Sequence, residues 1–96
     1  MNGLMMHCNL NITSIMRHAM MVHAEQEIVS LKSDGVSLHR YTYKDAFKRV
    51  AQFAHVLDQL NVAQHAKVGT LAWNTYQHME LHYAIPCSGR IYHTVN

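Results

Sequence analysis

Two stretches of the chain carry apolar residues at every third or fourth position, the spacing that places them on one face of a helix. The more regular stretch covers residues 43–60. Its apolar positions are Ala46, Phe47, Val50, Phe53, Ala54, Leu57 and Leu60. Polar residues fall on the opposite face, which is typical of a helix that packs against a core. We predict such a helix here, with Phe53 buried and Gln52 exposed.

Both ends of this helix carry terminal signals. Thr42 can cap the first turn, and Asp45 three residues later completes a capping box in which Asp replaces the usual Glu. Asn61 can end the helix in the left-handed conformation. The less regular stretch, residues 12–23, predicts another helix, for which Asn11 or Thr13 is the candidate cap.

Between the two helices lie two strand-like segments. Residues 27–31 (EIVSL) and 37–43 (SLHRYTY) are rich in β-branched and aromatic residues. The intervening Ser33, Asp34 and Gly35 favour a turn. The sequence therefore predicts an antiparallel hairpin, and the length of its loop leaves the register open.

The last third of the chain predicts a strand, a helix and a strand. Residues 67–73 (KVGTLAW) are almost continuously apolar, as in a strand buried on both faces of a parallel sheet. Asn74 or Thr75 is the candidate N-cap of a helix that ends near Ile85, and Gln77 would complete a second capping box with Asn74. Pro86 is expected to bend or end this helix.

Residues 90–95 (RIYHTV) again read as a strand, so the segment predicts a right-handed βαβ unit. Arg90 is unexpected at the start of a buried strand, because an unpaired buried charge is costly. The predicted fold class is α/β: a helix, a β-hairpin, a helix and then a βαβ unit. Two parallel strands with one helix do not complete a sheet domain, and we expect the sequence to be cut off.

Composition narrows the class of protein. The chain has 96 residues, enough for one small domain, and its 15% charged residues are fewer than the typical ~25%, so we expect it to pack against more protein. The net charge is +2 without a basic run, which argues against nucleic-acid and acidic-membrane partners. Cys8 and Cys87 suggest reduced thiols in a cytoplasmic protein. The Met-rich N-terminus is interrupted by polar residues and predicts neither a signal peptide nor a transmembrane segment.

Histidines are the candidate metal ligands. His78 and His82 are four residues apart and would share a helix face. In the zinc-protease pattern a glutamate follows the first histidine directly, whereas Glu80 here projects about 200° away from His78. A third ligand at suitable spacing is missing, so we predict no metal site. A histidine-rich metal or proton binder stays as a minor alternative.

Two longer segments carry a family resemblance. Residues 40–62 (RYTYKDAFKRVAQFAHVLDQLNV) precede residues 67–96 (KVGTLAWNTYQHMELHYAIPCSGRIYHTVN). Together they resemble the start of AMP-forming acyl-CoA synthetases of the adenylate-forming superfamily, especially medium- and long-chain fatty-acyl-CoA ligases and methylthiopropionyl-CoA ligases. The motifs TLAWN, HMELHYAIP and HTVN are the specific part. Asn61, Ala66 and Arg90 depart from the family pattern, which indicates a divergent member or relaxed constraint.

The resemblance implies a fold and an activity. Residues 11–96 would be a truncated N-terminal portion of the large AMP-binding domain, preceded by a disordered or variable N-terminus at residues 1–10. Family enzymes use ATP, Mg²⁺ and CoA to convert a fatty or other small carboxylic acid into its acyl-CoA. Their phosphate-binding loop and catalytic lysine match nothing here, since Gly3, Gly35, Gly69 and Gly89 are scattered. We therefore assign no catalytic, cofactor-binding or metal residue to this chain.

The resemblance leaves a second class of protein open. The chain could be a free-standing binding or dimerisation module, or the product of a truncated pseudogene, and a homodimer is compatible with it. The first hypothesis, an inactive N-terminal piece of an acyl-CoA ligase, is the one that the motifs favour. Acyl chain length cannot be read from these residues, because later segments build most of the family's acyl pocket.

Overall fold

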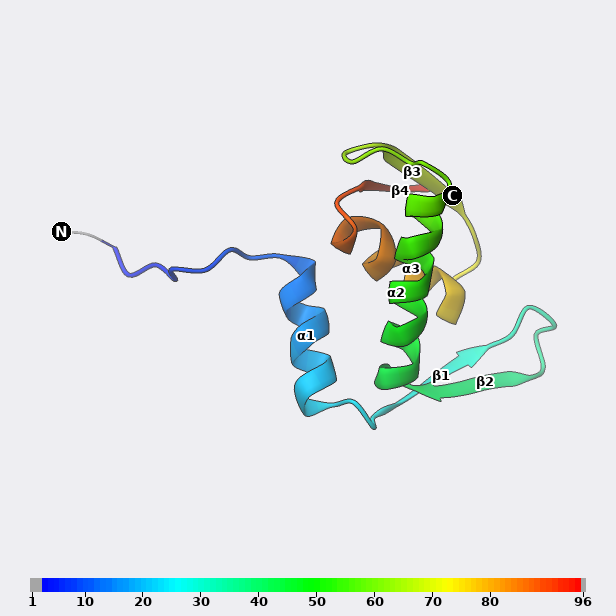
Figure 1. The fold of residues 1–96 in the computed structure, drawn as a ribbon. Coiled ribbons are helices and arrows are strands. Elements are labelled where there is room, and N and C mark those ends of the chain that lie inside the picture. The colour runs from blue at the N-terminus through cyan, green and yellow to red at the C-terminus, as the bar shows by residue number, and fades with distance from the viewer. Residues whose placement is uncertain (1–2, 96) are drawn as a thin grey trace.

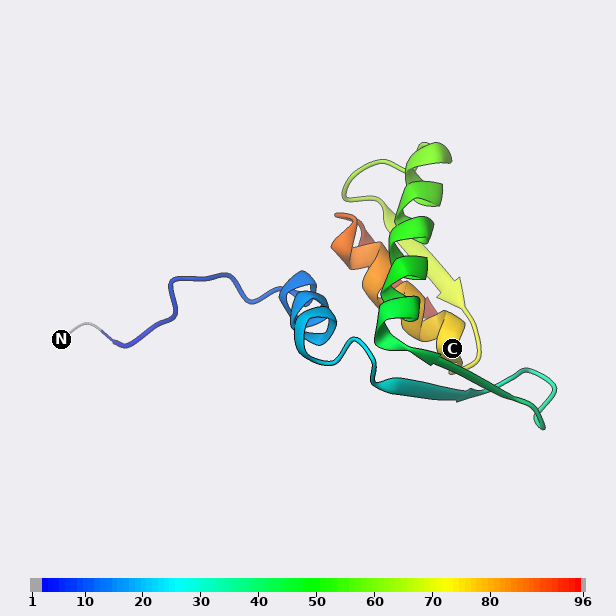
Figure 2. The ribbon, with the colours of Figure 1, turned by 60° about the horizontal axis from the view of Figure 1, so that its bottom comes forward.

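The computed structural model describes residues 3–95, and they form the predicted α/β order of elements. In chain order these are α1 (Ile12–Val22), β1 (Glu27–Leu31), β2 (Leu38–Thr42), α2 (Tyr43–Gln59), β3 (Lys67–Leu71), α3 (Tyr76–Cys87) and β4 (Ile91–Val95). Figure 1 shows α1 and α3 beside α2, with β3 and β4 at one end of this helical group. The N-terminal segment extends away from the helices, and the β1–β2 hairpin projects from the start of α2 (Figure 2).

The hairpin has the antiparallel pairing that the sequence predicts, and the structure supplies the register. Its turn is held by Asp34, whose Oδ1 accepts hydrogen bonds of 2.9 Å from the backbone amides of Val36 and Ser37. Gly35 has a φ of 73°, a conformation that glycine adopts without strain. The Ser37 hydroxyl and the two amides lower the pKa of Asp34 to about 2, because they stabilise the ionised carboxylate.

Helix α2 begins and ends as predicted. The Thr42 side chain accepts from the Asp45 amide at 3.3 Å, and the Asp45 carboxylate accepts from the Thr42 amide at 3.3 Å. This is the reciprocal capping box that the sequence indicates. At the other end Asn61 has a φ of 57°, so the left-handed termination is also confirmed.

The buried side of α2 agrees with the apolar pattern along most of its length. Ala46, Phe47, Val50 and Leu57 are buried, and Gln52 is exposed. Phe53 is half-buried rather than buried. The placement of Leu60 on this face is wrong: it is 67% exposed, because it is the C-cap residue and lies beyond the last helical turn.

A small core joins the three helices. Phe47 and Val50 of α2 meet Ala84 of α3, and the neighbouring apolar side chains surround them. The surrounding side chains are Met16, Ala19, Tyr43, Phe53 and Tyr83. Phe47 and Tyr83 pack edge-to-face with ring centroids 5.1 Å apart, a favoured aromatic geometry. Helix α1 thus contributes through its Met16–Ala19 side, while most of its other apolar residues stay exposed.

Strands β3 and β4 pair in parallel, which confirms the predicted strand–helix–strand unit. Burial of β3 on both faces is not observed. Val68 and Thr70 are half-buried, whereas Leu71 is 78% exposed and the following Trp73 is 84% exposed. The helices lie on one side of this two-stranded sheet, and within residues 3–95 no helix or strand covers the other side (Figures 1 and 2).

Helix α3 begins after Thr75, one of the two predicted N-cap residues, but its capping bonds and its end differ from the prediction. Thr75 is the N-cap and makes no side-chain capping bond, so the second capping box of Asn74 and Gln77 is wrong. The Thr75 amide instead donates to the Trp73 carbonyl at 2.8 Å, which turns the chain before the helix begins. The helix continues past Ile85 to Cys87, with Pro86 in its last turn, where a missing amide removes only one terminal bond.

Candidate functional site

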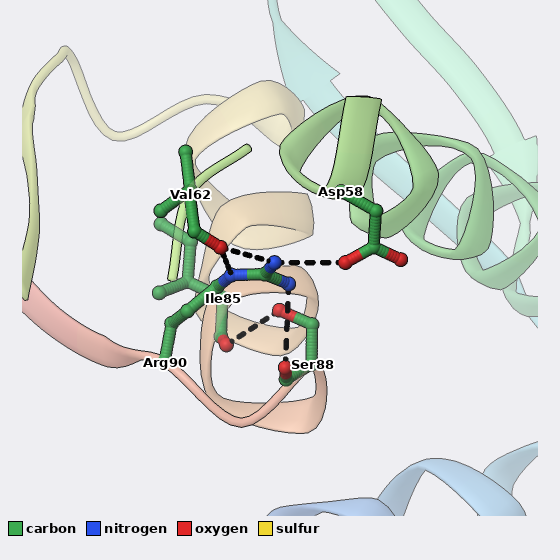
Figure 3. A network of polar contacts seen from close by, with 5 residues as sticks. All are labelled: Asp58, Val62, Ile85, Ser88 and Arg90. Atoms are coloured by element: carbon green, nitrogen blue, oxygen red, sulfur yellow. Dashed lines mark hydrogen bonds and ion pairs between the residues drawn. The ribbon is translucent and has the colours of Figure 1, made fainter. Parts of the chain in front are cut away.

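Arg90 lies at the centre of the most extensive polar network in the described residues, at the start of β4 (Figure 3). Its Nε and Nη2 donate to the Val62 carbonyl at 3.1 and 2.6 Å, and its Nη1 donates to the Ser88 carbonyl at 3.3 Å. Nη2 also donates to the Asp58 carboxylate at 2.8 Å. The Ser88 hydroxyl donates to the Ile85 carbonyl at 2.9 Å, which closes the end of α3 beside this network.

These contacts explain how an arginine is accommodated at the start of β4, where the sequence made it unexpected. The residue is 5% exposed, but an ion pair and three bonds to carbonyl oxygens satisfy its guanidinium. Asp58 comes from the end of α2 and Val62 from the loop after it. Arg90 thus links the end of α2 to the start of β4. Its role in this network is structural.

Glu80, in α3, is the centre of a second polar network. Its Oε1 accepts from the Tyr41 hydroxyl at 2.9 Å and from Arg49 Nε at 2.7 Å. The Glu80 side chain is 9% exposed, while that of Arg49 is 50% exposed. The hairpin, α2 and α3 each supply one member, so the buried carboxylate is neutralised where three elements meet.

The Glu80 network changes the acidity of its partners. Burial, followed by the hydrogen bond to Glu80, raises the pKa of Tyr41 above its ordinary value, because both disfavour the phenolate. The hydrogen bond to Glu80 also raises the pKa of the Arg49 guanidinium. Tyr41 is therefore a protonated hydrogen-bond donor at neutral pH, and Arg49 is fixed as a cation by its partner.

Aromatic stacking reinforces this contact between the hairpin and α3. The ring of His39 stacks on that of Tyr76 with centroids 3.7 Å apart and planes tilted by 14°. The Tyr76 amide, in the first turn of α3, donates to the Ser30 hydroxyl at 2.9 Å. His39 Nε2 is buried without a hydrogen-bond partner among the described residues. The stack fixes the hairpin against the N-terminal end of α3.

A depression of about 520 Å³ opens at the carboxyl ends of β3 and β4. Its lining consists of Leu71, Ala72, Trp73, Asn74, His78, Thr94 and Val95. Ligands of open α/β sheets bind outside the carboxyl ends of parallel strands, so this is the position where the fold would place one. The side chains here are mostly apolar, with Asn74, His78 and Thr94 as the polar groups.

Of the two candidate histidines, His78 lines this depression and His82 lies one helical turn further along α3. His78 Nε2 is 3.3 Å from Thr70 Oγ1, which donates to the Tyr92 hydroxyl at 3.1 Å. His82 Nδ1 is 3.2 Å from the His78 carbonyl, and the two imidazole centroids are 5.1 Å apart. Across residues 3–95, His, Cys, Asp and Glu side chains form no group of three or more that could hold a metal. The absence of a metal site stays a prediction.

The glycines that the sequence shows as scattered lie in separate elements. Gly35 is in the hairpin turn, Gly69 is in the middle of β3, and Gly89 precedes β4 with a φ of 81°. A phosphate-binding loop needs several adjacent backbone amides directed at one anion. These three glycines therefore contribute to three different local structures, and none belongs to a common loop with another.

A comparison with known protein families identifies the family of this α/β chain. The model of the AMP-binding enzyme family matches residues 17–96. The chain belongs to the AMP-binding enzyme family. Within the family it is 34% identical over 96 residues to a 3-methylmercaptopropionyl-CoA ligase of Ruegeria lacuscaerulensis, and 32% identical over 96 residues to a medium-chain-fatty-acid–CoA ligase of Ectopseudomonas oleovorans.

A third relative is a long-chain-fatty-acid–CoA ligase of Thermus thermophilus, which is 32% identical over 92 residues. The matches cover 96–100% of this chain but only 17–18% of the relatives. The chain thus spans less than a fifth of the length of these members of the AMP-binding enzyme family. None of the helices within residues 3–95 has the length and apolar character needed to cross a membrane.

Proposed function

We propose that this chain is the N-terminal scaffold segment of an ATP-dependent acyl-CoA ligase and is not catalytic by itself. The parent reaction converts a carboxylic acid, ATP and CoA into acyl-CoA, AMP and pyrophosphate. The observation that carries the proposal is the match of the whole chain to CoA ligases of which it covers less than a fifth. The α/β arrangement with a parallel β3–α3–β4 unit supports it as well.

The charged side chains support the non-catalytic part of the proposal. Adenylate formation needs cations and backbone donors that stabilise the transferring phosphate. Arg90 forms an ion pair with Asp58 and hydrogen bonds to carbonyl oxygens, and Arg49 forms an ion pair with Glu80. In this arrangement both arginines join secondary-structure elements, and Arg90, the buried cation within residues 3–95, has its donors occupied by protein acceptors. Their role is to hold the scaffold together.

The substrate proposal follows the names of the relatives. Two of them are named for medium- and long-chain fatty acids and one for 3-methylmercaptopropionate. We propose a fatty or other small carboxylic acid as the substrate of the parent enzyme, with ATP, Mg²⁺ and CoA as its cosubstrates and metal. We also propose a cytoplasmic location, since Cys8 and Cys87 are both free thiols.

A segment exchange tests the function. The 96-residue segment of the Ectopseudomonas ligase that aligns with this chain is replaced by the chain itself, and pyrophosphate release is measured with acids of graded length. We expect release from the chimera above a no-enzyme blank and none from the purified 96 residues. A folded chimera without release contradicts the scaffold proposal, and release from the 96 residues alone contradicts its non-catalytic part.

The matched control is a second chimera that carries Arg17→Ala. Arg17 is exposed on α1, so its loss should leave pyrophosphate release unchanged. Circular dichroism of each chimera shows whether it is folded before its activity is compared.

A further inference from the structure

The outer face of the β3–β4 sheet, the side turned away from α3, has no cover within residues 3–95. Alternate residues of a strand point to opposite faces. Thr70 and Tyr92 contact the α3 side, since Thr70 lies beside His78 and bonds to Tyr92. The residues of the outer face are therefore Lys67, Gly69, Leu71, Ile91, His93 and Val95, with register pairs Lys67–Ile91, Gly69–His93 and Leu71–Val95.

Apolar groups dominate the carboxyl-end half of this outer face. Leu71 is 78% exposed, its register partner Val95 is 45% exposed, and Trp73 just beyond β3 is 84% exposed. A contiguous set of large apolar residues that faces water is unusual in a monomeric soluble protein and marks an interaction surface.

Gly69 adds a second, independent observation. Its φ is outside the left-handed region, and a Cβ placed on it would have only the His93 carbonyl within 4 Å, at 3.9 Å. Neither the backbone conformation nor the space within this chain requires glycine there. Glycine in the middle of a strand lowers sheet stability and often marks the close approach of another backbone. Gly69 is explained if a further element packs tightly over the outer face.

We infer that the outer face is the interface with the part of an AMP-binding domain that lies outside these 96 residues, and that Gly69 is the point of closest approach. The inference rests on the proposed function and names the partner of the scaffold. The covering part is identified from how little of the relatives this chain spans. More than four-fifths of each matched relative lies beyond the region that aligns with this chain. The other occupant that such a face could take, a second copy of this chain, is an outcome of the test.

The test compares Gly69→Val in two settings. In the free 96-residue chain a valine at position 69 meets open space and favours the strand, so the unfolding midpoint should stay equal or rise. In the chimera with the Ectopseudomonas ligase the same side chain should collide with the covering element and lower the midpoint. Gly3→Val is the matched control, because a Cβ on Gly3 meets nothing within 4 Å, and it should change neither midpoint.

Trp73 provides a residue-specific readout, since it is the only tryptophan in the chain. Hydroxyl-radical oxidation followed by peptide mass spectrometry should modify Trp73 in the free chain and lose this modification in the chimera. Met21, 83% exposed on α1, serves as the reference. Footprinting of the unmodified Ectopseudomonas ligase at the positions aligned with residues 71–73 gives the same comparison without a chimera, and protection is expected there.

The outcomes distinguish the interface from the proposed function. Tolerance of Gly69→Val in the chimera, or an oxidised Trp73 in a chimera that releases pyrophosphate, overturns the interface and leaves the function intact. Protection of Trp73 in a chimera without ligase activity supports the interface and counts against the function. A concentration-dependent dimer of the free chain that protects Trp73 and is abolished by Gly69→Val overturns the inference in favour of a second copy.

Discussion

Arg90 Nη2 lies 2.8 Å from Asp58 Oδ1, and the two side chains of this ion pair differ widely in burial. The Arg90 side chain is 2% exposed, whereas that of Asp58 is 62% exposed. A guanidinium in this position depends on several acceptors, because one solvent-screened carboxylate cannot replace its hydration. The carbonyls of Val62 and Ser88 supply the rest of the acceptors.

The first prediction concerns the two ends of this pair. Arg90→Ala removes four hydrogen bonds and leaves the Val62 carbonyl without its donors, so it should lower the free energy of unfolding by about 2–4 kcal/mol. Asp58→Asn keeps an oxygen near the guanidinium at an exposed position and should cost about 1 kcal/mol or less. Urea denaturation followed by far-ultraviolet circular dichroism measures both.

Arg17→Ala is the control for this experiment, because Arg17 is exposed on α1 and should be nearly neutral. An equal or larger cost for Asp58→Asn than for Arg90→Ala would contradict the view that the carbonyl oxygens provide most of the stabilisation.

The second prediction separates two phenylalanines on the same helix face. Phe47 is 4% exposed at the centre of the core, and Phe47→Ala should cost about 3–5 kcal/mol. Phe53 is half-buried at the edge of that core, and Phe53→Ala should cost less, about 1–3 kcal/mol. Gln52→Ala on the exposed side should be close to neutral. Thermal unfolding of the three variants gives the order, and a larger loss for Phe53→Ala than for Phe47→Ala contradicts it.

The sequence was enough to predict those elements that depend on interactions between neighbouring residues. The capping box of Thr42 and Asp45 and the left-handed Asn61 depend only on neighbouring residues, so both ends of α2 were predictable. The β3–α3–β4 unit followed from an apolar run, a helical segment and a second strand-like run. Where a signal was weak, as with Asn74, the turn made by the Thr75 amide and the Trp73 carbonyl replaced the predicted cap.

The polar networks were not predictable in this way. Tyr41 and Glu80 are 39 residues apart, and Asp58 and Arg90 are 32 apart, so no local spacing relates them. Arg90 in an apolar segment did signal something unusual, but the acceptors that satisfy it are backbone carbonyls, which have no sequence signature. The exposure of Leu71 likewise depends on what covers a sheet face, which periodicity cannot reveal.

The third prediction concerns alkaline pH. Because the pKa of Tyr41 in the folded chain is raised above 10.0, the unfolded state loses this proton first as the pH rises. The contribution of Tyr41 to stability is therefore complete below about pH 10 and is lost as the pH rises through the folded-state pKa. Tyr41→Phe should remove this component of the stability profile and cost about 1 kcal/mol at neutral pH, where one hydrogen bond to Glu80 is lost.

Chemical denaturation between pH 7 and pH 11 measures the difference between the wild-type chain and Tyr41→Phe. The difference isolates Tyr41 from Tyr83, whose pKa burial also raises. A difference that stays constant across this range contradicts the prediction.

The last prediction concerns Zn²⁺ and the two histidines of α3. His78 and His82 share a helix face, but each has a ring nitrogen close to a protein oxygen, and no third ligand joins them within residues 3–95. A zinc ion needs at least three protein ligands held by their own hydrogen-bond partners to bind tightly. Calorimetric titration should therefore show only weak, non-stoichiometric binding, equal in the wild-type chain, His82→Ala and the control His55→Ala, whose histidine is exposed on α2. A single stoichiometric site with a sub-micromolar Kd that His82→Ala abolishes and His55→Ala preserves would show that the pair is a metal centre.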